Sequence, residues 1–241
     1  VGPYAEQDAA VTLRLWDRLE QELREDECTG IFELESSLTP LLLDMKQAGV
    51  RVDIDRAEQV RKELKSREDT LLEEIKVETG VFVEPWVATS IAKAFDALGI
   101  KYERTEKSNA PAFTKAFLAN HEHPVAQKIV RLREFNKANT TFIETILEHS
   151  HNGRIHCDFH PLRSDEGGTV TGRFSSSNPN LQQIPARDPE IKKMIRGLFI
   201  PEEGYQWGSF DYASQEPRWL AHYCASRSNP HPMIQEVVQE Y

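Results

Sequence analysis

The sequence WGSFDYASQEPRWLAH spans residues 207–222 and carries the strongest signal in this chain of 241 residues. Its apolar start predicts a short strand over Tyr205–Phe210, which places the carboxylate of Asp211 at the strand end. A helix is expected over Ala213–Ser226, with Pro217 in its first turn, where a missing N–H costs nothing. An acid in such a place either caps the helix or holds a metal ion, and spacing alone does not decide between these roles.

The residues before this segment begin with a helical part. Apolar side chains recur there at helical spacing among charged ones. Asp55 is the expected N-cap of a long charged helix, and glycines are expected to end the helices. The predicted helices span Ala5–Glu27, Leu34–Ala48, Asp55–Glu78, Trp86–Leu98 and Val125–His149, with an extended piece at Val50–Asp53.

A mixed part follows the helices. Residues 154–160 alternate like a strand, and the stretch Ser164–Pro189, rich in Gly, Ser, Thr and Pro, predicts a loop. Strand alternation puts His156, Asp158 and His160 on one face, where a zinc site could be considered. Structural zinc sites usually pair Cys or His ligands at clearer spacing, so ordinary groove or surface residues are the preferred interpretation.

Composition describes a globular protein with 39% hydrophobic and 28% charged residues. No apolar run is long enough to cross a membrane, and no secretory signal opens the sequence. Three widely spaced cysteines indicate free thiols in a reducing compartment. The net charge is −10, but residues 128–199 hold 11 Lys and Arg against 8 Asp and Glu. A locally basic middle permits a nucleic-acid groove without demonstrating one.

Several segments resemble DNA polymerases of family A, the DNA polymerase I type. DYASQEPRWLAH, residues 211–222, resembles the family's motif A, and TGRFSSSNPNLQQIPAR, residues 171–187, resembles its TGRLSSSDPNLQNIPxR segment. Residues 133–142, REFNKANTTF, are similar to the family's thumb segment, and residues 48–53, AGVRVD, to the opening of its polymerase domain. The sequence SQEPR, residues 214–218, resembles that of phage members of the family.

The resemblance implies an α+β fold, with a helical thumb and the partial palm of a right-hand polymerase. It implies the end of a 3′–5′ exonuclease domain over residues 1–30, the thumb region over 31–150 and the partial palm over 151–241. The fingers and the remaining palm are absent. The implied function is DNA-templated DNA synthesis in replication or repair, by an enzyme of which this chain is an incomplete fragment.

The resemblance also assigns catalytic roles. Asp211 becomes a ligand of two divalent ions, expected to be Mg²⁺, and the backbone carbonyl of Tyr212 completes part of the shell. Glu216 becomes a steric gate that excludes a ribose 2′-hydroxyl, although a glutamate in a first helical turn is also favoured by the helix dipole. The pattern departs at residues 213–215, which read Ala-Ser-Gln, and at Pro217.

Further residues are implied to bind primer–template DNA. The resemblance places donors to the minor groove on the loop and contacts to duplex phosphates on the thumb helix. Gln183 stands where the family has Asn, which leaves its role open. The loop residues are Arg173, Asn180 and Gln182, and the thumb residues are Arg133 and Lys137. Taken alone, a loop arginine such as Arg173 is usually a solvated surface charge, and solvation is also the alternative for Arg133 and Lys137.

Tyr4 and Asp8 lie at i and i+4 on one face of the first predicted helix. The segment resembles the third motif of the proofreading exonuclease, in which Asp8 would bind a metal ion and Tyr4 would orient the attacking water. An ordinary N-terminal helix without a catalytic role is the alternative interpretation. The other exonuclease motifs are absent.

Other functions remain open from the sequence. One alternative is a fragment that only binds primer–template. Another is a related single-subunit RNA polymerase, against which Glu216 argues. The charged helix also allows a helical scaffold. The expected partners are primer–template DNA and deoxynucleoside triphosphates, with no membrane and no obligate oligomer. The expected location is the cytoplasm of a bacterial or phage-infected cell.

Overall fold

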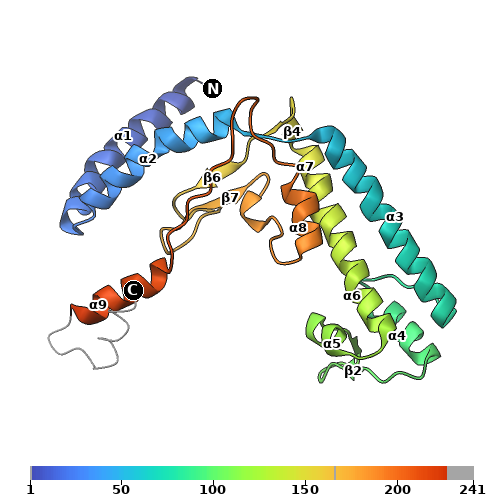
Figure 1. Cartoon of the computed structure of the whole chain (residues 1–241). Coiled ribbons are helices and arrows are strands. Elements are labelled where there is room, and N and C mark those ends of the chain that lie inside the picture. Colours follow the sequence, from blue (N-terminus) through green and yellow to red (C-terminus); the bar gives the residue numbers. More distant parts are fainter. Residues whose placement is uncertain (1, 166, 227–241) are drawn as a thin grey trace. The chain divides into compact units, whose positions relative to one another are not determined.

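The computed structural model describes residues 2–165 and 167–226. These residues fall in two compact units, over residues 1–200 and 201–241. Helices predominate, and the strands form small antiparallel sheets (Figure 1). The predicted α+β class is therefore confirmed.

A hairpin of two helices opens the first unit. α1 spans Gly2–Glu25 and α2 spans Thr29–Ala48, and none of the side chains of α1 is buried. Gly49 ends α2, as predicted, with φ of +62°. A Cβ at this position would lie 2.7 Å from the ring of His156, so both the backbone conformation and the space require glycine.

The long helix α3 spans Ile54–Thr79 and packs along α6, Pro124–Lys137 (Figure 1). Asp53 caps α3, because its side chain accepts a hydrogen bond of 2.9 Å from the backbone N–H of Arg56. The prediction of Asp55 as the cap was wrong by two residues, and Asp55 lies in the first turn. An aspartate is favourable in both places, since either lies at the positive end of the helix dipole.

The predicted helix Val125–His149 is continuous but not uniform. α6 passes into a π-helical turn, η1 (Ala138–Ile143), and then into α7 (Glu144–Glu148). One core lies between α3, these elements and α8 (Pro189–Arg196), with Leu64 and Ile195 fully buried in it. The sequence pattern did not predict α8, although Asp188 and Pro189 are residues that commonly begin a helix.

A second core lies toward the other end of α3 and α6. It is built around Phe95 on α4 (Ala88–Ala97), which contacts the rings of Phe113 and Tyr102. The remaining elements of this part are the strand pair β2 (Glu103–Arg104) and β3 (Pro111–Ala112), and the helix α5 (Lys115–Asn120). This small module caps the end of the helix pair.

Two short sheets connect distant parts of the first unit. β5 (Arg154–Ile155) lies between β1 (Val50–Arg51) and β4 (Ser150–His151), so the boundary predicted at residue 150 falls within a sheet. β6 (Asp158–His160) pairs with β7 (Ser175–Ser177), Phe159 opposite Ser176. The prediction of an unbroken loop over Ser164–Pro189 was thus wrong, because serines with little strand preference still pair with a suitable neighbour.

The second unit contains α9, Gln215–Ala225, close to the predicted helix. The strand predicted over Tyr205–Phe210 is wrong: no strand is assigned to these residues. A strand needs a partner for its backbone N–H and C=O groups, and none is described within residues 201–226. Phe210 is 97% exposed accordingly.

Candidate active site and nucleic-acid interface

Asp211 lies on an extended segment just before a tight turn. Ser214 has φ of +53° and precedes the first residue of α9, and the Arg218 side chain donates a hydrogen bond of 2.9 Å to the carbonyl of Ala213. Asp211 and Tyr212 are exposed and line a shallow hollow together with Trp219 of α9. The carboxylate is thus presented to solvent and not used as a helix cap.

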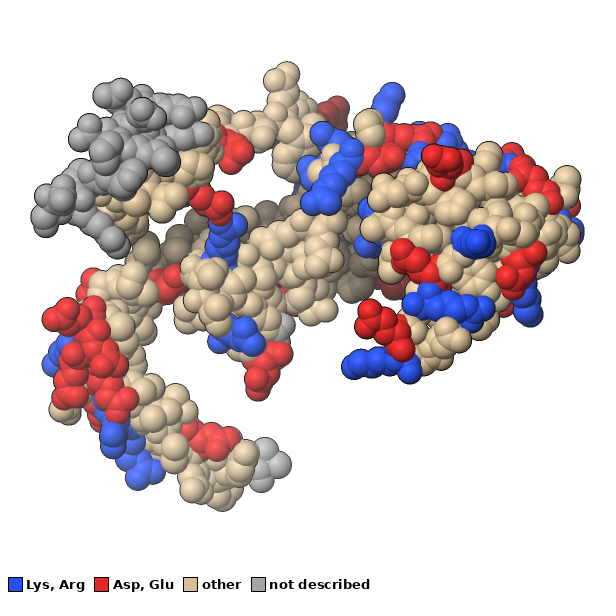
Figure 2. Space-filling view, turned by 90° about the horizontal axis from the view of Figure 1, so that it is seen from below, with Lys and Arg blue, Asp and Glu red and all other residues tan. Residues whose placement is uncertain are grey.

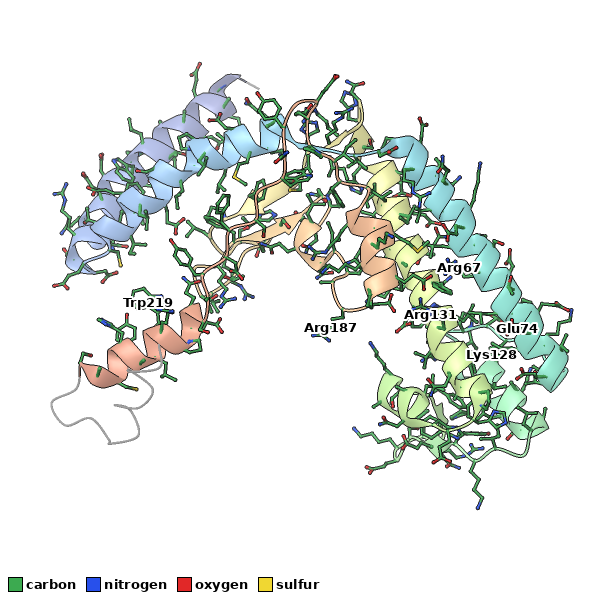
Figure 3. All side chains as sticks on the ribbon, in the orientation of Figure 1. Arg67, Glu74, Lys128, Arg131, Arg187 and Trp219 are labelled. Atoms are coloured by element: carbon green, nitrogen blue, oxygen red, sulfur yellow. The ribbon has the colours of Figure 1, made fainter. Side chains whose placement is uncertain are left out.

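Glu216 lies in the first turn of α9, one residue before Pro217. Asp211 lies before the turn at residues 213–214 and Glu216 just after it, so the two predicted acids belong to one short segment of the second unit. Trp219, labelled in Figure 3, stacks on Tyr223 of the same helix with ring centroids 6.0 Å apart. The segment therefore combines two exposed acids with an aromatic face.

The oxygens of Asp211 and of the Tyr212 backbone are the hard donors that a divalent cation prefers. Among the residues that the structure describes, however, no group of three or more His, Cys, Asp or Glu is placed to hold a metal ion. Asp211 thus fits as one ligand, and a complete metal site is not formed by residues 2–165 and 167–226. The histidines near β6 gather no such group either; instead His160 shares a hydrogen bond of 2.8 Å with Ser177.

The three loop residues predicted to bind DNA come together around β7. Asn180 accepts hydrogen bonds at its Oδ1 from the Ser176 hydroxyl, at 3.1 Å, and from the backbone N–H of Gln182, at 3.0 Å. The Gln182 side chain donates to the carbonyl of Phe174, which directly follows Arg173. These contacts fold the loop on itself, and all three predicted side chains lie at an exposed surface.

The two predicted thumb residues differ in their surroundings. Lys137 ends α6 and is exposed. Arg133 is half-buried: it donates to the carbonyls of Pro85, at 2.6 Å, and Phe113, at 2.9 Å, and lies over the ring of Trp86. Burial lowers the pKa of Arg133. These contacts favour a structural role for Arg133 over the predicted phosphate contact, whereas the position of Lys137 is compatible with one.

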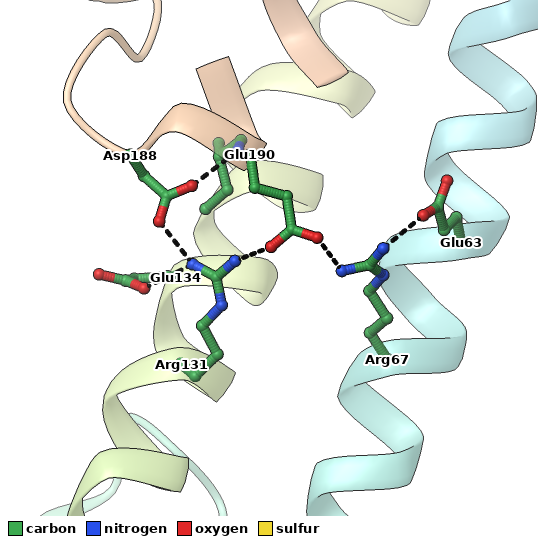
Figure 4. A network of polar contacts seen from close by, with 7 residues as sticks. Glu63, Arg67, Arg131, Glu134, Asp188 and Glu190 are labelled. Carbon is green, nitrogen blue, oxygen red and sulfur yellow. Dashed lines mark hydrogen bonds and ion pairs between the residues drawn. The ribbon is translucent and has the colours of Figure 1, made fainter. Parts of the chain in front are cut away.

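A network of ion pairs joins α8 to the helix pair (Figure 4). Arg131 of α6 contacts Glu134, Asp188 and Glu190, and Arg67 of α3 contacts Glu190 and Glu63. The backbone N–H of Ile191 and the guanidinium of Arg131 hold the pKa of Asp188 below its usual value. Hydrogen bonding from Arg67 does the same to the pKa of Glu190. Sequence reasoning missed this network, since its members are far apart in the chain.

Charge is otherwise mixed over the surface. On the face seen in Figure 2, Lys and Arg side chains are interspersed with Asp and Glu. Lys128 of α6, for example, pairs with Glu74 and Glu78 of α3 (Figure 3). Lys128 and Arg131, two of the basic residues counted in residues 128–199, thus form ion pairs within the protein.

The N-terminal pair lies on α1. Tyr4 is 73% exposed, Asp8 is also exposed, and the Asp8 carbonyl accepts a hydrogen bond from the hydroxyl of Thr12. Their spacing places them on one helical face. The exonuclease role remains a prediction.

Comparison with known proteins identifies the family. The sequence pattern of "DNA polymerase family A" matches residues 54–231. The chain belongs to DNA polymerase family A. It is 39% identical over 233 residues to the DNA-directed DNA polymerase of Pseudomonas phage M6, covering 92% of this chain and 35% of the phage protein. The thermostable DNA polymerase I of Thermus aquaticus is 35% identical, with 86% of this chain and 25% of that protein covered.

A solved structure also resembles this member of family A. It contains the POL domain of Pol1 from M. smegmatis in complex with DNA primer–template and dNTP. The TM-score is 0.70 at 26% sequence identity, covering 87% of this chain and 37% of that one. The chain thus spans about a third of such relatives. No helix of the described residues is long and apolar enough to cross a membrane.

Proposed function

We propose that the complete protein extends a DNA primer on a DNA template with deoxynucleoside triphosphates, and that Asp211 lies at its catalytic centre. The observation that carries the proposal is the exposed carboxylate of Asp211 on the turn before α9, within a segment resembling motif A. The M. smegmatis relative, whose structure contains primer–template and dNTP, supports these substrates.

Asp211 would hold divalent cations, expected to be Mg²⁺, together with the carbonyl of Tyr212 and with acids outside the described residues. Such ions, when bound, stabilise charge on the attacking and leaving oxygens. Glu216 would occupy the space of a ribose 2′-hydroxyl and so select deoxynucleotides. This role distinguishes the proposal from a single-subunit RNA polymerase, which must admit the 2′-hydroxyl.

The loop around β7 and the end of α6 would hold the duplex. Arg173, Asn180 and Gln182 are exposed together and present donors that suit the acceptors of the minor groove. Lys137 would contact a phosphate without regard to sequence. The 241 residues alone would bind primer–template without turnover, because the described part provides only one of the catalytic acids required.

The test is primer extension by the complete polymerase carrying Asp211→Ala. We expect the rate of nucleotide addition to fall by at least about 100-fold, since a lost metal ligand removes several kcal/mol of charge stabilisation. Asp69→Ala is the control, because Asp69 is an exposed acid of α3 whose ion pair is with Lys65 of the same helix. Near-normal extension by the Asp211 variant would refute the proposal.

A further inference from the structure

Two basic residues of α6 make similar ion pairs but connect to different parts of the protein. The side chains of Lys128 and Arg131 are 23% and 27% exposed, and each contacts acidic side chains on other elements. Lys128 pairs with Glu74 and Glu78 of α3, which already packs along α6. Arg131 instead reaches the start of α8, where it pairs with Asp188 and Glu190.

The position of Arg131 is itself fixed. Its guanidinium lies over the ring of Phe135, 4.3 Å from the centroid, and the same ring is faced by Arg67 at 5.5 Å. Nη1 of Arg131 is 2.7 Å from Asp188 and 3.0 Å from Glu134, while its Nη2 contacts Glu190. A planar guanidinium can hold several carboxylate oxygens in one fixed orientation, which an ammonium cannot.

From α8 the contacts continue into the loop around β7. Asp188 caps α8 by accepting a hydrogen bond of 2.7 Å from the backbone N–H of Ile191. At the other end of α8, the Arg196 side chain donates to the carbonyls of Pro185, at 3.0 Å, and Ile184, at 3.4 Å. Ile184 is two residues from Gln182. Contacts thus extend without a break from Arg131 to the backbone beside the loop side chains.

We propose that Arg131 is a positioning residue for nucleotide addition, which acts through Asp188 and Glu190 on α8 to orient the loop that carries Asn180 and Gln182. The inference rests on the proposed function, in which this loop contacts the primer–template. Partly exposed ion pairs contribute little to stability, so orientation is the role that this arrangement serves best. The ion pairs of Lys128 are with Glu74 and Glu78 of α3, so Lys128 serves as the matched comparison.

The test compares Arg131→Gln with Lys128→Gln in the complete polymerase. For Arg131→Gln we expect kcat of primer extension to fall about three- to tenfold, the range typical of losing a coupled network contact. The Kd for primer–template should change by less than about twofold, since no phosphate contact is removed. Lys128→Gln should leave kcat unchanged. Arg131→Lys should restore only part of the rate, because it keeps the charge and loses the fork.

A double-mutant cycle with Gln182→Ala shows whether Arg131 acts through the loop. If two substitutions act independently, their fold-changes in kcat multiply. We expect the kcat of the Arg131→Gln/Gln182→Ala double variant to differ from this product by about threefold or more, and that of the Lys128→Gln/Gln182→Ala double variant to equal it. Independent effects in both double variants would overturn the inference. So would losses of kcat and melting temperature that are the same in Arg131→Gln as in Lys128→Gln. Failure of the proposed function is distinguishable, because the unmutated protein would then not extend a primer at all.

Discussion

The helix pair α3 and α6 of the first unit buries many side chains but carries no highly specific sequence motif. The α9 segment of the second unit shows the reverse. α3 and α6 share two cores and two ion pairs made by Lys128, although the likeness of residues 133–142 to the family's thumb segment is less specific than the motif over residues 211–222. The α9 segment carries the most specific motif but buries only Ala221 of its helix. Scaffold residues can vary as long as they pack, whereas residues that meet substrate are fixed by chemistry rather than by burial.

The largest effect that separates the two regions is on stability. Leu64 is fully buried on α3, and Leu220 on α9 is 64% exposed. Leu64→Ala should lower the free energy of unfolding by about 2–5 kcal/mol through lost burial and a residual cavity. Leu220→Ala should change it by less than about 0.5 kcal/mol. Urea unfolding of the 241-residue chain measures both, and a large loss for Leu220→Ala would break the comparison.

For substrate selection, we expect a larger effect from a substitution on α9 than from one in the first unit. Glu216→Ala should increase the incorporation of ribonucleotides relative to deoxynucleotides by at least about tenfold, because it opens the space for a 2′-hydroxyl. The ratio of kcat/KM for the two substrates in the complete polymerase is the measurement. Glu144→Ala on α7 is a matched control, since it removes a carboxylate from the first unit. Unchanged selection in the Glu216 variant would leave this residue only a helix-terminal acid.

Within α6, the salt dependence of primer–template binding distinguishes a phosphate contact from a structural arginine. Lys137→Gln should weaken binding several-fold and reduce the slope of log K against log salt by about 1. Arg133→Gln should leave the slope unchanged, because its guanidinium is held by Pro85 and Phe113 carbonyls. Titrations at several salt concentrations provide the slopes. A reduced slope for Arg133→Gln would restore the phosphate contact originally predicted.

The smallest expected effect concerns pH. The pKa values of Asp188 and Glu190 are lowered in the folded protein, so their stabilisation is present above the unfolded value of about 4 and is lost as pH falls through the folded values. The Glu190 side chain is 43% exposed, so screening should keep its contribution below about 1 kcal/mol.

Glu190→Gln should therefore destabilise the chain slightly at pH 7 and make its stability less sensitive to acid below about pH 4. Urea unfolding at these pH values is the measurement. Glu58→Gln is the control, because the ion pair of Glu58 is with Arg61, one turn away on α3. An identical acid dependence in the Glu190 variant and the unmutated chain would show that the network does not contribute.

Much of the helical architecture followed from the sequence. The positions of Gly49 and Gly80 placed the ends of α2 and α3 to within one residue, and the apolar spacing placed most of each helix, although α2 begins five residues before the predicted Leu34. The pattern failed for β7 and for the strand expected over Tyr205–Phe210. A strand depends on a partner elsewhere in the chain, and local residues do not reveal whether that partner exists.

For the candidate site, the sequence alone predicted which residues take part: the acids Asp211 and Glu216, and the donors of the loop. Those predictions come from short local motifs, which are recognised by the order of their residues along the chain. Tertiary structure alone decided that Arg133 faces inward and that Arg131 connects α6 to α8, 57 residues away along the chain at Asp188. Side-chain contacts between distant segments depend on how helices pack, and no local pattern specifies them.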